Sequence, residues 1–184
     1  MKSSIAYQTL DTSISSAIEI TMPPNVLQTM AHLYDIDHLL RNYKNYSASK
    51  SSVHAEYPWA TNFVMGHPLA PWQVGAGWSE EQNKFFITKA WSGGYLGTYM
   101  INAWHRVVDG SFEQYSNLLV DGQQRLRALE HYFRDRFAVK DVSGEPRYWS
   151  ELPSSEHRRF LAIPFIRISV HTSDEDELWA MQKQ

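Results

Sequence analysis

One stretch of the chain constrains the fold more than any other. Its hydrophobic residues change from the pattern of a strand to the spacing of a helix with no linker in between. Residues 117–133 read NLLVDGQQRLRALEHYF. The apolar run 118–120 is typical of a buried strand, and Leu126, Leu129 and Phe133 then recur at helical spacing, which predicts a helix over 123–137. Only Asp121-Gly122 separates the two patterns. A strand that leads directly into a helix predicts a small domain in which helices pack on a sheet.

Other segments indicate the same mixed class. Ser79 followed by Gln82 is a capping-box pattern, which predicts a helix from there to Trp91 that ends at Gly93-Gly94. The Asp109-Gly110 pair is typical of a hairpin turn. We expect strands over 96–108, 112–120 and 163–171, and further helices over 154–161 and 172–184. With no internal repeat, this mixed order predicts an α+β fold.

The first 56 residues read differently from the rest. Residues 1–22 are polar, and Pro23-Pro24 then opens an apolar stripe that predicts a helix to Asn42. The Ser-, Lys- and Asn-rich stretch 43–53 indicates a loop. We therefore expect residues 1–56 to form an N-terminal helical extension and linker, and residues 57–184 to form the domain proper, with 57–77 mostly extended or looped.

Composition excludes several classes of protein. A chain of 184 residues, 43% of them hydrophobic, fits one domain with an ordinary core. The absence of cysteine excludes disulfides, thiolate zinc sites and a cysteine nucleophile, and it fits a cytoplasmic protein. No run of about 18 apolar residues occurs, so we expect no membrane span. A net charge of −3 gives duplex DNA binding no support, although a local basic patch stays open.

The Asp-Gly turn is the best candidate site in the sequence. The first N–H groups of a helix have no backbone partner and carry partial positive charge, so the start at Gly122 predicts an anion site that a ligand can approach closely. Arg125 opposes the helix dipole by about 0.3–1 kcal/mol, which an arriving anion would offset. Gln123 and Gln124 add donors, and Asp121 could orient Arg125, hold Mg²⁺ or position a water. On spacing alone, a plain turn capped by Asp121 is the simpler interpretation.

A family resemblance changes this weighting. Asp121-Gly122-Gln123-Gln124-Arg125, followed by Leu and a helix, resembles the signature of the DUF262 family and is similar to the phosphate turn of ParB-like CTPases and sulfiredoxin. Gln73 and Trp78 keep the family spacing upstream, and Gly93 and Gly97 match its glycines. The family's Arg and Pro are replaced by Val74 and Tyr95. The resemblance covers about residues 57–184.

The resemblance implies a ParB/sulfiredoxin-like fold, with a small mixed sheet and packed helices, that binds an NTP. On this resemblance, the residues that contact the nucleotide phosphates would be Gly122, Gln123, Gln124, Arg125, Gln73, Gly93 and Gly97. Asp121, Gln124 and Arg125 would be catalytic residues of a Mg²⁺-dependent NTP hydrolase, with Asp121 as the metal ligand. Because DUF262 proteins act in DNA restriction and phage defence, a DNA-binding or DNA-cleaving module is a second hypothesis. A non-catalytic regulator or phage counter-defence protein, which would bind a nuclease domain or another protein, is a third.

Aromatic and histidine residues offer weaker candidates. Trp72 and Trp78 flank Gln73 and could stack on a base, although large aromatic residues more often fill a core. His67, His105 and His171 could line a pocket, but none of the eight histidines has a metal-ligand spacing. The acidic run 174–177 fits the start of a helix, where negative charge is favourable.

Overall fold

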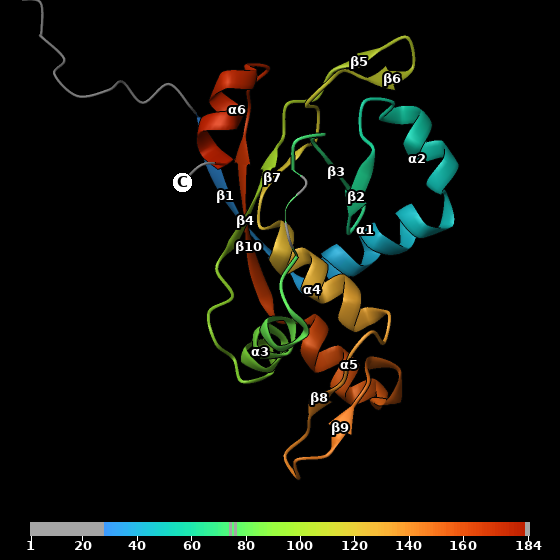
Figure 1. Cartoon of the computed structure of the whole chain (residues 1–184), viewed down its shortest axis with the longest axis vertical. Helices are drawn as coiled ribbons and strands as arrows, with labels where there is room; N and C mark the ends of the chain where they lie inside the picture. Colours follow the sequence, from blue (N-terminus) through green and yellow to red (C-terminus); the bar gives the residue numbers. More distant parts are fainter. Residues whose placement is uncertain (1–27, 74, 76, 183–184) are drawn as a thin grey trace, which may run out of the picture.

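A four-stranded mixed sheet organises the molecule, which is α+β as expected (Figure 1). The computed structural model describes residues 28–73, 75 and 77–182. Within the sheet the strands lie in the order β1, β10, β4 and β7, which span Thr29–Asp35, Pro164–Val170, Thr98–Asn102 and Leu119–Asp121. Strand β10 runs parallel to β4, while β1–β10 and β4–β7 are antiparallel pairs.

Three two-stranded ribbons project from this frame. They are β2 with β3 (Asn62–Val64 and His67–Leu69), β5 with β6 (Val107–Val108 and Ser111–Phe112), and β8 with β9 (Val139–Lys140 and Pro146–Arg147). The turn between β5 and β6 is the predicted one, because Asp109 and Gly110 both have positive φ, at 51° and 83°.

Helices cover the sheet and follow one another as α1 Ile36–Ala48, α2 Lys50–Glu56, α3 Glu80–Trp91, α4 Gln123–Phe133, α5 Ser154–Leu161 and α6 Glu175–Gln182, with a 3₁₀ turn at Trp149–Glu151. The capping box that starts α3 is confirmed, since the Ser79 hydroxyl accepts the Gln82 N–H and the Gln82 side chain accepts the Ser79 N–H. No helix among the described residues is long and apolar enough to cross a membrane.

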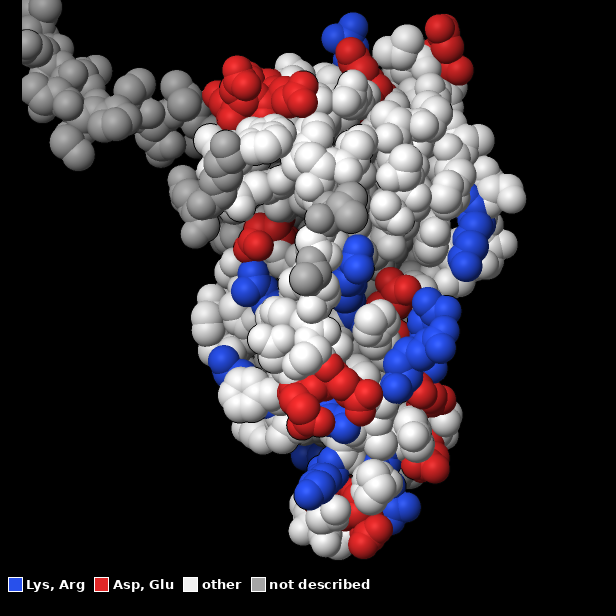
Figure 2. All heavy atoms as spheres, viewed as in Figure 1, with Lys and Arg blue, Asp and Glu red and all other residues white. Residues whose placement is uncertain are grey.

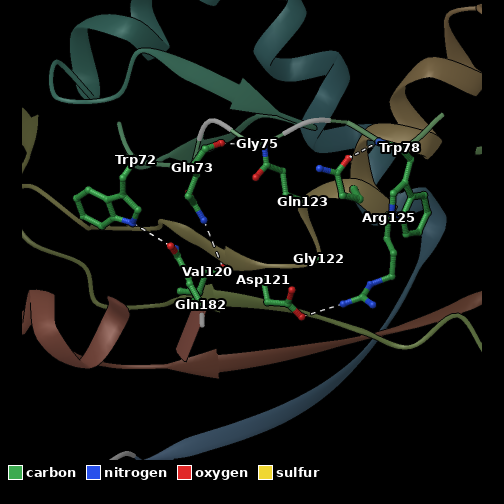
Figure 3. Close-up of a pocket in the computed structure, with 11 residues that line it drawn as sticks. Trp72, Gln73, Gly75, Trp78, Val120, Asp121, Gly122, Gln123, Arg125 and Gln182 are labelled. Carbon is green, nitrogen blue, oxygen red and sulfur yellow. Dashed lines mark hydrogen bonds and ion pairs between the residues drawn. The ribbon is translucent and has the colours of Figure 1, made fainter. Parts of the chain in front are cut away.

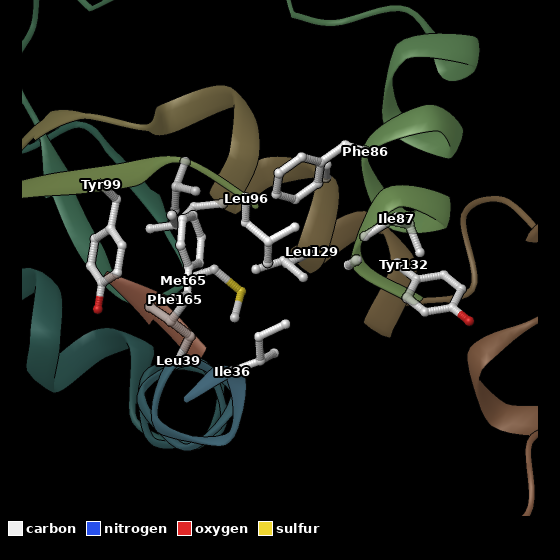
Figure 4. Close-up of a cluster of buried hydrophobic side chains, with 14 of the residues drawn as sticks. Ile36, Leu39, Met65, Phe86, Ile87, Leu96, Tyr99, Leu129, Tyr132 and Phe165 are labelled. Carbon is white, nitrogen blue, oxygen red and sulfur yellow. The ribbon is translucent and has the colours of Figure 1, made fainter. Parts of the chain in front are cut away.

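The main core lies where α1, α3 and α4 meet one face of the sheet (Figure 4). Side chains from all four elements point toward one another there, and the labelled ones include Ile36, Leu39, Phe86, Leu129 and Phe165. A smaller apolar cluster under α6 includes Leu118, Val120, Val170 and Leu178. Helix α4 runs through the middle of the larger core, so its N-terminus is held in place by packing along most of its length.

The N-terminal prediction is wrong over part of its length. Thr29–Asp35 is not helical but pairs with β10 as a strand of the central sheet. The helix begins only at Ile36, where Asp35 caps it by accepting the His38 N–H at 3.0 Å. A long partner strand overrides the helical spacing of this stretch, because strand formation depends on tertiary pairing. The remaining part of the predicted helix, residues 23–27, lies outside the described residues.

The predicted loop at 43–53 is also wrong, because α1 runs to Ala48 and α2 follows from Lys50. The polar composition of this stretch suggested a loop, but Tyr46 packs the segment against the fold. Its ring stacks on Phe63 of β2, with the ring centroids 5.1 Å apart. The segment before residue 57 thus shares the sheet and the core with the rest of the chain.

Two elements were predicted to be longer than they are. The expected strand 112–120 forms only at its two ends, because Tyr115 and Asn117 take positive φ values of 69° and 57° and turn the chain. The helix expected to reach residue 137 ends at Phe133, and Asp135 has a φ of 53°. The helices at 80–91 and 154–161 are confirmed.

Candidate functional site

A cavity of about 390 Å³ opens at the N-terminus of α4 (Figure 3). We call it the α4 cavity. One wall is the loop after β3, and the other is the end of β7 with the first turn of α4. Its lining residues are Trp72, Gln73, Gly75, Trp78, Val120, Asp121, Gly122, Gln123, Gln124, Arg125 and Gln182. The structure therefore brings together most of the predicted site residues from two separate segments.

Gly122 starts α4 in a left-handed conformation, with a φ of 89°. Its carbonyl accepts the Leu126 N–H at 3.0 Å, so the amides of residues 123–125 have no carbonyl one turn back inside the helix. A Cβ on Gly122 would lie 2.6 Å from the Tyr99 Cβ and 2.9 Å from its Cα. Close packing against β4 therefore explains this glycine, where the sequence suggested room for a ligand.

Arg125 lies along one side of the cavity, and Asp121 reaches toward it (Figure 3). Its Nη2 is 2.8 Å from Asp121 Oδ2, and the two side chains are 27% and 57% exposed. The Arg125 Nε is buried and has no hydrogen-bond partner. A Cβ on Gly97 would lie 3.4 Å from the Arg125 Nη1, so Gly97 borders the guanidinium. Gly93 does not join them, since it follows the C-terminus of α3 and is not among the lining residues.

The glutamines of the motif hold the cavity walls together. Gln73 donates from Nε2 to the carbonyls of Leu119 and Val120, at 2.7 and 3.3 Å, and its Oε1 accepts the Ala70 N–H at 2.8 Å. Gln124 accepts the Trp78 N–H at 3.1 Å. These bonds join the loop after β3 to β7 and α4. The Gln73 amide, which we expected to contact a ligand, is thus engaged with the backbone.

Gln123 lies between the Gln73 carbonyl and the Arg127 guanidinium. Its amide bonds one or the other according to which way it is turned, with an Oε1 to Arg127 Nη2 distance of 2.8 Å in the turned orientation. The bond to Gln73 links the two walls of the α4 cavity, whereas the bond to Arg127 stays within α4.

The two tryptophans border the cavity at its opposite ends (Figure 3). Trp72 donates from Nε1 to Gln182 Oε1 at 2.8 Å, and its ring centroid is 5.5 Å from that of Tyr115. Trp78 packs on Phe86 at 5.6 Å. Both are half-buried, so each keeps an accessible portion beside the cavity while the rest of its ring is packed.

The charges around the cavity are mixed. No group of three or more His, Asp or Glu side chains that could hold a metal exists among the described residues, and Asp121 is the carboxylate of the lining. On the visible face of the molecule, Lys and Arg side chains alternate with Asp and Glu instead of forming one continuous basic surface (Figure 2). A metal at Asp121 would therefore need ligands that arrive with the substrate.

The chain is without a detected relative. No family model, no curated protein and no solved structure matches it. The resemblance to the DUF262 family thus stays a prediction that rests on the motif, and function has to be argued from the geometry of the cavities.

A second cavity, of about 520 Å³, lies between α1, α2, β3 and β10, and we call it the α1–α2 cavity. His67 and His105, two of the predicted pocket histidines, line it instead of the α4 cavity, and His171 lines neither. Arg167 also lines it, and sequence reasoning missed this residue as a site candidate. The available signal was a cation at the centre of a strand that is otherwise largely apolar.

Proposed function

We propose that the α4 cavity binds a nucleotide through its phosphate groups, as the resemblance to the DUF262 family predicts. The observation that carries this proposal is the position of Arg125. Its guanidinium lines the cavity beside the first turn of α4, where the N–H groups point out of the helix end, and its buried Nε lacks a partner. A phosphate at this position would accept from both kinds of donor and would meet the positive end of the helix dipole.

The ion pair with Asp121 prepares Arg125 for this task. It holds the guanidinium within one turn of its own helix, while Gly97 borders it from β4's N-terminal side. Because the side chain is already ordered, binding costs less conformational entropy than it would for a free arginine. Asp121 is 57% exposed and can turn away from Arg125 without leaving a buried charge.

We assign to Asp121 the role of protein ligand for Mg²⁺, and the phosphates of the nucleotide would supply further ligands. Mg²⁺ is commonly bound through one or two carboxylates together with substrate phosphates and waters. This assignment agrees with the lack of a preformed cluster of ligands among the described residues. Trp72 and Trp78 lie where a base extending from the phosphates would reach an aromatic edge.

Titration calorimetry with ATP, GTP, CTP and UTP, each with and without Mg²⁺, tests the proposal. Arg125→Gln should raise the Kd at least about tenfold, because a hydrogen bond to a charged group contributes about 1.5–3 kcal/mol. Arg134→Gln is the matched control, since Arg134 caps the C-terminus of the same helix and pairs with Glu130 four residues earlier. Equal affinities for native protein and Arg125→Gln would contradict the proposal.

Asp121→Asn tests the metal ligand separately. We expect it to remove the difference between titrations with and without Mg²⁺, because the amide cannot replace a carboxylate on this cation. Phosphate released in the same samples distinguishes hydrolysis from binding. A Mg²⁺ effect that persists in Asp121→Asn would overturn the assignment of the metal ligand while leaving the role of Arg125 intact.

A further inference from the structure

Arg167 lies in the middle of β10, one of the two central strands of the sheet. In the register of the sheet it is opposite Tyr99 on β4 and His32 on β1. Its side chain is on the same face of β10 as Phe165 and Ser169, which are 1% exposed. A guanidinium on the inner face of a sheet is costly unless another group interacts with it.

The contacts that Arg167 makes account for only part of this cost. Its guanidinium lies over the Tyr34 ring, 4.7 Å from the centroid, and Tyr34 stacks on His38 at 4.2 Å. Among the described residues, no carboxylate forms an ion pair with Arg167. Its Nε is buried without a hydrogen-bond partner. The cation is thus oriented by an aromatic ring but not neutralised.

His67 presents a second unpartnered nitrogen to the same region. It lines the α1–α2 cavity with Arg167, and its Nε2 is buried without a partner. Burial, and then the nearby Arg167 guanidinium, lower the pKa of His67 from 6.5 to about 4, so the imidazole is neutral at pH 7. The Tyr99 hydroxyl, whose ring centroid is 6.4 Å from that of His67, is also buried without a partner.

We infer that the α1–α2 cavity binds the oxyanion of a small molecule, a carboxylate or a phosphate, with Arg167 and His67 as its donors. Arginine matches both oxyanions bidentately, and the Nε2–H tautomer of a neutral imidazole donates one further bond. The volume of about 520 Å³ admits a metabolite-sized ligand. Asn42, Asn45 and Tyr46 of α1 offer neutral polar groups along the wall. Glu56, which is exposed, is the carboxylate among the lining residues.

Two-dimensional ¹H–¹⁵N spectra of arginine Nε–H groups test the inference directly. The titrations use Arg125→Gln protein, so that the α4 cavity contributes nothing, with inorganic phosphate in one series and sodium acetate in the other. We expect the Arg167 Nε–H signal to shift saturably in at least one series, and the His67 ring signals to follow with the same midpoint. The series that saturates identifies the oxyanion.

Arg159 is the internal control for these spectra. It stacks over Trp91 at 4.9 Å much as Arg167 stacks over Tyr34, but it pairs with Glu156 and lines neither the α4 nor the α1–α2 cavity. Its Nε–H should move only in proportion to ionic strength. Arg167→Gln should abolish the saturable shift of the His67 signals. A linear drift of Arg167 that matches Arg159 in both series would overturn the inference, and so would saturable shifts of His67 that persist in Arg167→Gln.

Discussion

The two cavities place an arginine beside buried polar groups in opposite ways. In the α4 cavity, Arg125 is paired with Asp121 of the same turn, and the side-chain amides of Gln73 and Gln124 are hydrogen-bonded to neighbouring backbone groups. In the α1–α2 cavity, Arg167 and His67 come from different strands, and no carboxylate among the described residues forms an ion pair with Arg167. The arginine and its partner in the first site come from one short motif, whereas Arg167 and His67 meet only through the fold.

Tyr99 lies between the two sites and connects them. Its Cα and Cβ pack against Gly122 at the start of α4, and its ring is near His67. The same residue therefore packs against the start of α4 at one site and has an unpartnered hydroxyl near the other. Substitutions at and around Tyr99 therefore distinguish what each region contributes to the stability of the fold from its capacity to bind a ligand.

The largest effect on stability should come from Gly122→Ala. The new Cβ would lie 2.6 Å from the Tyr99 Cβ, and the alanine would have to keep the positive φ of this position. Together these effects should lower the free energy of unfolding by about 3 kcal/mol or more. Gly93→Ala is the control, because it has a similar φ of 73° but nothing within 4 Å, so it should cost only about 1 kcal/mol. Urea denaturation of both variants measures the difference. Equal losses would show that the contact with β4 is not what requires this glycine.

The next effect is a dependence of stability on pH through His67. The unfolded chain binds a proton at this imidazole near pH 6.5, whereas the folded protein does so only near pH 4, because burial and then Arg167 lower the pKa. Between these values the unfolded state binds more protons, so the free energy of unfolding should fall by up to about 3 kcal/mol as the pH is lowered from 6.5 to 4.

His67→Gln isolates this contribution. The variant should lose most of the difference between pH 6.5 and pH 4 in denaturation curves. His38 and His131, whose pKa values are also lowered first by burial, and Asp141, whose pKa is lowered by hydrogen bonds from Ser143 and Arg147, supply the smaller part that remains. An unchanged pH profile in His67→Gln would show that the imidazole takes up its proton in the folded protein as readily as in the unfolded chain.

Gln73→Ala should have a smaller effect, of about 2 kcal/mol, because it removes the side-chain partner of the Ala70 N–H and of the Leu119 and Val120 carbonyls. Gln82→Ala, in the exposed capping box of α3, should cost about 1 kcal/mol or less. Thermal unfolding of both variants, followed by calorimetry with nucleotide, separates stability from binding. A Gln73→Ala protein of native stability that fails to bind would make Gln73 a ligand contact after all.

The smallest effect should have the opposite sign. Tyr99→Phe removes a buried hydroxyl that lacks a partner, and it should stabilise the ligand-free protein by about 1 kcal/mol. Tyr132→Phe should instead destabilise it by about 1 kcal/mol, because the Tyr132 hydroxyl accepts the Trp91 indole N–H at 3.2 Å. The two denaturation midpoints are compared in one buffer. A loss of stability in Tyr99→Phe would mean that its hydroxyl has a partner in solution.

Local signals in the sequence predicted the elements whose chemistry is contained in a few neighbouring residues. The capping box at Ser79, the hairpin at Asp109-Gly110 and the start of α4 after Gly122 are all of this kind. The strand Thr29–Asp35 could not be predicted in this way, since it depends on pairing with the distant strand β10, Pro164–Val170. The same distinction explains why Asp121–Arg125 was found and the cluster around Arg167 was not.

Arginine Nε–H spectra of the native protein, titrated with a non-hydrolysable nucleoside triphosphate and Mg²⁺, test the central claim most directly. The account predicts that the Arg125 signal shifts saturably, because its Nε is buried without a partner beside the first turn of α4. The Arg134 signal, at the other end of the same helix, should stay unchanged. A saturating nucleotide that leaves the Arg125 signal in place, or no saturation with any nucleotide, would contradict the account.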